Sequence, residues 1–132
     1  MPTTIQQHVT LPASAKKLYT MYLSPRAHAA FTGAPVIIGR NPGDAFVAFG
    51  GQISGTMIAT APSRLIVQHW RSVNFGKRDL DSTLILTFTD VGENSARIDL
   101  VHINVSDRDA EGVSKGWSMF YWKPWRRHLL RS

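Results

Sequence analysis

The sequence predicts an α+β fold in which a curved antiparallel sheet encloses one long C-terminal helix. Most of the chain consists of short segments with two-residue periodicity, separated by turn sequences, which is typical of strands joined by hairpins. Helical periodicity then runs through Gly112–Leu130, a segment that carries three tryptophans. Such a helix needs a large apolar surface to cover it, because one aromatic side chain buries roughly 150–250 Å².

Length and composition favour a single domain that spans residues 1–132. A hydrophobic fraction of 43% with 18% charged residues is ordinary for a globular fold and argues against disorder. The absence of cysteine excludes disulfides, thiolate nucleophiles and cysteine metal sites, and it fits a reducing compartment. We see neither a signal peptide nor an apolar stretch of the ~20 residues that span a bilayer. We therefore expect a cytoplasmic protein without a membrane span.

The N-terminal third begins with a strand and continues with two short helices. Thr3–Leu11 alternates apolar and polar residues, which predicts the strand. Ser14 is a candidate N-cap for a first helix, and Ser24 followed by Pro25 is typical of the start of a second. The sequence Thr-Gly-Ala-Pro at 32–35 ends that helix.

The middle of the chain is predicted to be β throughout. Turn sequences at 41–44, 50–51, 61–63 and 91–94 separate the segments. The predicted strands are Val36–Ile38, Ala45–Phe49, Gln52–Thr60, Arg64–Arg71, Ser82–Asp90 and Ala96–Val105. Short connections make the sheet antiparallel. Ser54-Gly55 and Gly50-Gly51 match no phosphate-binding motif, so we interpret both as hairpin glycines.

The final helix has an apolar arc that should face the sheet. Its members recur at i, i+4, i+7 and i+8, with two further tryptophans widening the arc. They are Val113, Trp117, Phe120, Tyr121, Trp122, Pro124, Trp125 and Leu129. Pro124 should remove one backbone hydrogen bond and kink the helix, either to fit a curved sheet or to form a hinge beside a cavity.

The formal net charge is +6, and the basic residues are scattered along the sequence. The only local cluster is Lys123, Arg126, Arg127 and Arg131, which we expect to spread around the last helix. These cations also suit the negative end of the helix dipole. A weak contact with an anionic partner stays open, whereas dedicated nucleic-acid binding is not indicated.

Residues that carry chemistry are isolated in the sequence. No histidine lies in a motif with metal-ligand spacing, and no serine lies in a nucleophile elbow. His102 shares a strand face with Ile98 and Leu100 and should point inward, and we expect the same of His69. Each is interpreted as a core histidine or as a polar anchor for a ligand. The carboxylates lie in turns or at element ends, except Asp99, which lies within a strand and should share the outer face with Arg97.

Six segments, in order, resemble one family. They are Ala30–Pro35, Asn41–Phe46, Phe49–Gly55, Val67–Arg71, Ser82–Phe88 and Gly116–Trp122. Together they are similar to the family homologous to the C-terminal domain of the activator of the heat-shock-protein-90 ATPase, the AHSA-type family. This resemblance extends over about Thr3 to Leu130 and implies the START-like, Bet v 1-like helix-grip superfamily, β-α-α-β6-α, with a cavity between sheet and last helix.

The resemblance and the pattern together favour a binding module over an enzyme. We expect a small, largely apolar ligand in the cavity, with aromatic side chains supplying contact area and His102, Tyr121 or Arg71 orienting a polar group. The candidate ligand-binding residues are Phe31, Phe49, Met57, Trp70, Arg71, Leu86, His102, Trp117 and Tyr121. No catalytic residue, metal ligand or cofactor is indicated.

Two other functions stay open. The family resemblance implies a chaperone-associated interaction module in the stress response, which could contact a heat-shock chaperone or form a homodimer. The eukaryotic activator, however, has an additional N-terminal domain for which 132 residues leave no room. The superfamily also includes polyketide cyclases and hydrolases, and that activity would require a titratable pair that converges in the cavity.

Overall fold

The computed structural model describes residues 2–131 and confirms the α+β helix-grip fold. The N-terminal elements are β1 (Thr3–Leu11), α1 (Ala15–Leu23) and α2 (Pro25–Thr32). The β region contains β2 (Val36–Ile37), β3 (Ala45–Ala48), the 3₁₀ turn η1 (Phe49–Gly51), β4 (Ile53–Ala61), β5 (Leu65–Ser72), β6 (Ser82–Gly92) and β7 (Ser95–Val105). The last helix has three segments: α3 (Ala110–Gly116), the π-helical turn η2 (Trp117–Trp122) and α4 (Lys123–Arg131).

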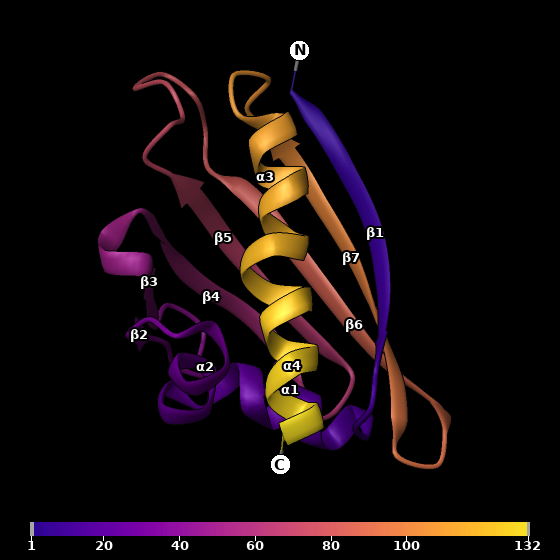
Figure 1. The fold of residues 1–132 in the computed structure, drawn as a ribbon. Helices are drawn as coiled ribbons and strands as arrows, with labels where there is room; N and C mark the ends of the chain where they lie inside the picture. The colour runs from indigo at the N-terminus through magenta and orange to yellow at the C-terminus, as the bar shows by residue number, and fades with distance from the viewer. Residues whose placement is uncertain (1, 132) are drawn as a thin grey trace.

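The strands form one antiparallel sheet in the order β1-β7-β6-β5-β4-β3-β2. Figure 1 shows the last helix lying along one face of this curved sheet, with α1 and α2 gathered beneath its C-terminal half. The interior between sheet and helix holds the hydrophobic core. The predicted strand-helix-helix-six strands-helix order is therefore confirmed.

Both short helices begin at the predicted caps. The Oγ of Ser14 accepts a hydrogen bond from Lys17 N, and the Oγ of Ser24 accepts one from Ala27 N. Pro25 occupies the first helical position, where its missing N–H leaves no bond unmade. Gly33 ends α2 in the left-handed conformation, with φ of 80°.

Strand periodicity decides which side chains enter the core. Leu84, Leu86, Ile98, Leu100 and His102 are buried on the face that the helix covers. The ion pair of Arg97 with Asp99 lies on the opposite face, with Nε 3.1 Å from Oδ2. These assignments confirm the sequence pattern for β6 and β7.

Two predictions in β4 and β5 are wrong. His69 is exposed, because the inward residues of β5 are Ile66, Gln68 and Trp70. Gly55 is no hairpin glycine, since it lies within β4 opposite Phe46 and Trp70. A Cβ at this glycine would stand 1.8 Å from the carbonyl oxygen of His69, so only glycine fits so close to the neighbouring strand.

In the middle of the long helix, the π turn changes which side chains face the sheet. Its buried residues are Val113, Trp117, Tyr121, Trp122, Trp125 and Leu129. A regular α-helix turns by about 100° per residue, so positions four apart drift by about 40° at each step. The wider π turn absorbs part of that drift, and Lys123 N bonds to Ser118 O across it. Pro124 is the second residue of α4, directly after the π turn. Phe120 was expected on the buried face, but it is exposed.

Candidate functional site

A groove of about 400 Å³ opens between the first half of the last helix and the end of the sheet at β4 and β5. Its walls come from η1, β5 and η2, and its rim comes from the loops after β5 and before α3. The lining residues are Phe49, Gln52, Ile53, Trp70, Ser72, Asn74, Asp109, Gly112, Val113, Gly116, Trp117, Phe120 and Tyr121. Three of its five aromatic residues belong to the π turn.

The five aromatic rings of the groove contact one another in sequence. Ring centroids lie 6.2 Å apart for Trp70 and Trp117, and 4.8 Å apart for Trp117 and Tyr121. Phe49 stands edge-on to Tyr121 at 5.9 Å and lies 5.7 Å from Phe120. The result is a continuous aromatic wall in which Trp70, Trp117 and Tyr121 are buried behind the more exposed Phe49 and Phe120.

Glycines leave the helical side of the groove open. Gly112 and Gly116 are one helical turn apart, and both line the groove. A Cβ at Gly116 would meet only Phe120 carbons, the nearest at 3.6 Å, which is an ordinary contact. The space therefore exists because side chains are absent where the helix passes over the sheet.

Phe49 is held at the groove by an unusual backbone. Its φ is 53°, and the two glycines that follow also have positive φ. The left-handed region costs a non-glycine residue roughly 1–2 kcal/mol. A strained turn of this kind is typical of functional sites, and here it places the Phe49 ring against Phe120 and Tyr121.

Beneath the aromatic wall, a buried hydrogen-bond chain runs from Trp117 through His102 and Ser82 to the Trp70 carbonyl. The indole Nε1 of Trp117 donates to His102 Nδ1 at 3.2 Å, and the hydroxyl of Ser82 donates to the carbonyl of Trp70. His102 Nε2 therefore carries the proton and donates to Ser82 Oγ at 2.8 Å. Burial lowers the pKa of His102 to about 3. The chain positions the Trp117 ring and keeps this histidine neutral.

A second buried chain holds Tyr121. Its hydroxyl donates to His28 Nε2 at 2.8 Å, while His28 Nδ1 donates to the Tyr22 carbonyl at 2.7 Å. The hydroxyl of Tyr22 in turn donates to Gln68 Oε1 at 2.6 Å. Burial lowers the pKa of His28 to about 4, and the bond to the Tyr22 backbone opposes this shift. Burial also raises the pKa of Tyr121.

The loop between β5 and β6 closes one end of the groove. Arg71 donates to the carbonyls of Asp79 and Gly76 at 2.6 and 2.7 Å. The Asp79 carboxylate accepts hydrogen bonds from Ser106 Oγ and Gly76 N. Both bonds lower the pKa of Asp79, and the bond from Ser106 has the larger effect. These bonds hold Phe75 beside Trp70, with ring centroids 6.1 Å apart.

The structure brings four of the nine candidate residues together at the groove: Phe49, Trp70, Trp117 and Tyr121. Four others are core residues outside its lining: Phe31, Met57, Leu86 and His102. The ninth, Arg71, is bonded to the loop. The polar atoms of His102 and Arg71 thus already have protein partners.

Neither the rim residues nor the two glycines were among the candidates predicted from the sequence. Gln52, Asn74 and Asp109 reach the groove from turns, where periodicity gives no signal, and Ser72 reaches it from the last position of β5. The two glycines could have been found from the sequence. Each immediately precedes a buried residue of the helix, Val113 or Trp117, so it lies beside the face that packs on the sheet. Within the lining, the only ionisable side chains are those of Asp109 and Tyr121. In residues 2–131 no group of three or more histidine, aspartate or glutamate side chains could hold a metal ion.

Comparisons with known proteins identify related chains. The family model described as "Activator of Hsp90 ATPase homolog 1-like protein" matches residues 12–123. An uncharacterized protein of Schizosaccharomyces pombe is 34% identical over 67 residues, which cover 51% of this chain and 20% of that protein. The aligned region thus spans only about a fifth of that relative.

Solved structures share the fold. An HSP90 activator from Plasmodium falciparum has a TM-score of 0.81 at 19% identity, with 91% of each chain covered. A Mesorhizobium loti protein has a TM-score of 0.83 at 15% identity, with 98% of each covered. The Aha1 dimer of Colwellia psychrerythraea has a TM-score of 0.75 at 13% identity, with 92% of each covered. At these identities the likeness establishes the fold alone.

Proposed function

Because the chain belongs to the family of activator of Hsp90 ATPase homolog 1-like proteins, we propose that it is a binding module for a small, flat, largely apolar molecule. The ligand occupies the aromatic groove beside the π turn. Phe49, Trp70, Trp117 and Tyr121 supply the contact area, and Phe120 covers the ligand from the rim. Family members and the fold they share serve both ligand binding and chaperone association, so the groove itself carries this proposal.

The supporting observation is an open volume whose walls are aromatic and whose rim is polar. About 400 Å³ lies within the ~300–1,000 Å³ range of small-molecule sites. Gln52, Ser72, Asn74 and Asp109 stand at the rim, where they can hydrogen-bond the polar end of a ligand. Trp117 and Tyr121 are held from behind by His102 and His28, so their rings are oriented before a ligand arrives.

A substitution that fills the groove tests this proposal. Anilinonaphthalene sulfonate, an apolar aromatic dye, should bind the protein with enhanced fluorescence and quench tryptophan emission. Gly116→Leu should weaken dye binding at least about tenfold, because its side chain enters the groove. Gly116→Ala adds one methyl group and is the matched control, expected within about threefold of the parent. Equal binding by the parent and Gly116→Leu would refute the site.

Chaperone association is a second candidate, favoured by the exposed Met119 and Phe120 beside the groove and by the likeness to an HSP90 activator. In this case the protein should raise the ATPase rate of a purified heat-shock chaperone, and Phe120→Ala should lower that stimulation. Dimer formation would show as a concentration-dependent mass in solution. A cyclase or hydrolase activity has the weakest support, because the Tyr121 hydroxyl is already committed to a hydrogen bond that it donates to the buried His28.

A further inference from the structure

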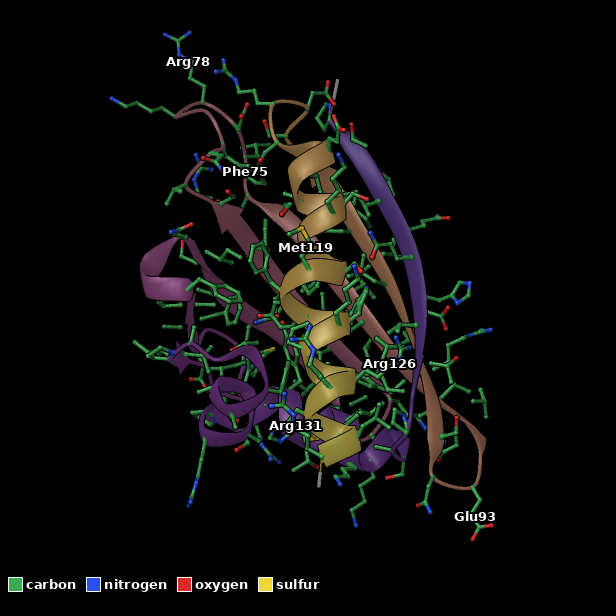
Figure 2. The ribbon with its side chains drawn as sticks, in the orientation of Figure 1. Phe75, Arg78, Glu93, Met119, Arg126 and Arg131 are labelled. Atoms are coloured by element: carbon green, nitrogen blue, oxygen red, sulfur yellow. The ribbon has the colours of Figure 1, made fainter. Side chains whose placement is uncertain are left out.

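The exposed side of the last helix carries cations interleaved with large apolar side chains. We define the outer strip as Lys115, Met119, Phe120, Lys123, Arg126, Arg127, Leu130 and Arg131, all of which are exposed. Its central line, Lys115-Met119-Lys123-Arg126-Leu130, advances by four, four, three and four residues, the spacing of one helical face. Figure 2 shows Met119, Arg126 and Arg131 distributed along this helix.

The sequence suggested that the cations spread around the last helix. In the structure they lie on its exposed side instead. Trp117, Trp122 and Trp125 occupy the side that faces the sheet, so every lysine and arginine of α4 is left on the exposed side. The buried tryptophans thus concentrate positive charge on the opposite side of the helix.

Among the described residues, little negative charge balances the cations of the strip. Residues 112–131 contain five lysines and arginines and no acidic side chain. Of the three side-chain ion pairs within residues 2–131, only that of Lys115 with Glu111 involves the strip. Arg126 donates to the carbonyl of Thr10 at 2.7 Å, which leaves its charge uncompensated. The strip is therefore a ready site for an anionic surface.

The apolar members of the strip indicate that the anionic surface it binds is not purely charged. Met119, Phe120 and Leu130 are 59%, 54% and 70% exposed, although other apolar residues of this helix are buried. Alternating cations and apolar side chains on one helical face match the boundary between anionic headgroups and acyl chains. A nucleic acid would engage the cations but leave Met119 and Leu130 without a role.

We propose that the outer strip docks this protein flat on an anionic lipid bilayer. The cations contact phospholipid headgroups, and Met119, Phe120 and Leu130 enter the boundary with the acyl chains. Within residues 2–131 no helix has the length and apolar character needed to traverse a bilayer, so this attachment is peripheral. It does not depend on a ligand in the groove, although Phe120 belongs to both the strip and the rim.

Co-sedimentation with vesicles tests the proposal. The parent should bind phosphatidylcholine vesicles that contain phosphatidylserine, bind phosphatidylcholine alone far more weakly, and be released by salt. Each cation near an anionic surface contributes roughly fivefold to binding, so Lys123→Gln with Arg127→Gln should lose about 10–30-fold. Leu130→Ser, which leaves the charge unchanged, should lose about threefold or more.

The matched control has the same change in net charge elsewhere. Lys77→Gln with Arg78→Gln, in the exposed β5–β6 loop, also lowers the formal charge of +6 by two. Figure 2 shows Arg78 far from the middle of the helix. This variant should bind within about threefold of the parent. Equal losses in the two double variants, or no binding of the parent to phosphatidylserine vesicles, would overturn the proposal. Strip-dependent binding to single-stranded DNA without vesicle binding would overturn it as well.

Discussion

The two halves of the last helix cover the same sheet, yet the C-terminal half lies over buried side chains of α1 and α2, whereas the N-terminal half borders a groove. In the C-terminal half, Trp125 is fully buried and stacks on Phe31, with ring centroids 4.2 Å apart and planes 8° from parallel. In the N-terminal half, Trp117 and Tyr121 line open space. Both tryptophans are therefore buried, but Trp125 is enclosed by the core, whereas Trp117 also borders the groove.

The difference comes from what lies opposite each half. Helices α1 and α2 fill the C-terminal end with Tyr22, His28 and Phe31, whereas Figure 1 shows neither helix beneath α3. Gly112 and Gly116 also supply no side chain there. A similar spacing of large residues along the helix thus gives either a core or a site, depending on its neighbours.

The largest expected effect lies in the packed half. Trp125→Ala should lower the free energy of unfolding by about 3–5 kcal/mol, because it leaves a cavity against Phe31. Phe120→Ala, at the rim of the groove, should cost less than about 1 kcal/mol. Urea denaturation monitored by circular dichroism measures both. Similar losses in the two variants would erase the distinction between the halves.

A smaller loss of stability is expected beside the groove, at Gly55 of β4, which lies opposite Trp70 of β5. Gly55→Ala should cost about 1–3 kcal/mol, because its Cβ would collide with the carbonyl of His69. Gly92→Ala is the control, since a Cβ there would lie 3.8 Å from the nearest atom outside its neighbours. If the two variants unfold at the same urea concentration, the close approach of these strands is not rigid.

Two buried neutral histidines, His28 and His102, bond to side chains of the last helix, and both should make stability depend on pH. The folded pKa values of about 4 for His28 and about 3 for His102 lie below the unfolded value of 6.5. Their contribution is therefore fully present above pH 6.5 and declines as pH falls towards the folded values, by up to about 1.4 kcal/mol per pH unit for each.

Denaturation midpoints between pH 7 and pH 4.5 measure this slope. His28→Gln and His102→Gln should each remove about half of it, even where the variant is less stable at pH 7. Tyr22 and Tyr121, which contact His28, keep their protons in this range because burial raises their pKa values. A slope that neither substitution changes would assign the acid sensitivity to other groups.

The smallest effect is a gain in stability. Gly116→Ala should raise the free energy of unfolding by about 0.5–1 kcal/mol, because alanine favours the helix and the groove has room for its Cβ. Gly33→Ala should instead destabilise, since its φ of 80° strains any side chain. Destabilisation by Gly116→Ala would mean that the groove is closed in solution.

Several features of the fold could be predicted from local pattern. The caps at Ser14 and Ser24 and the inward face of β6 and β7 follow from chemistry within a few residues. The face of β5 was misassigned at His69 because both of its faces carry apolar residues, Leu65 and Val67 on one and Ile66 and Trp70 on the other. Periodicity alone cannot choose between two such faces.

The sequence by itself determined the order of elements and the aromatic character of the last helix, because both depend on residues close together in the chain. Only the tertiary structure decided where the helix and sheet leave space, which histidines are buried and which side of the helix gathers the cations. Those outcomes depend on contacts between distant segments, such as Tyr121 with His28 and Trp117 with His102. No local pattern encodes the fit of two surfaces that meet only in the folded chain.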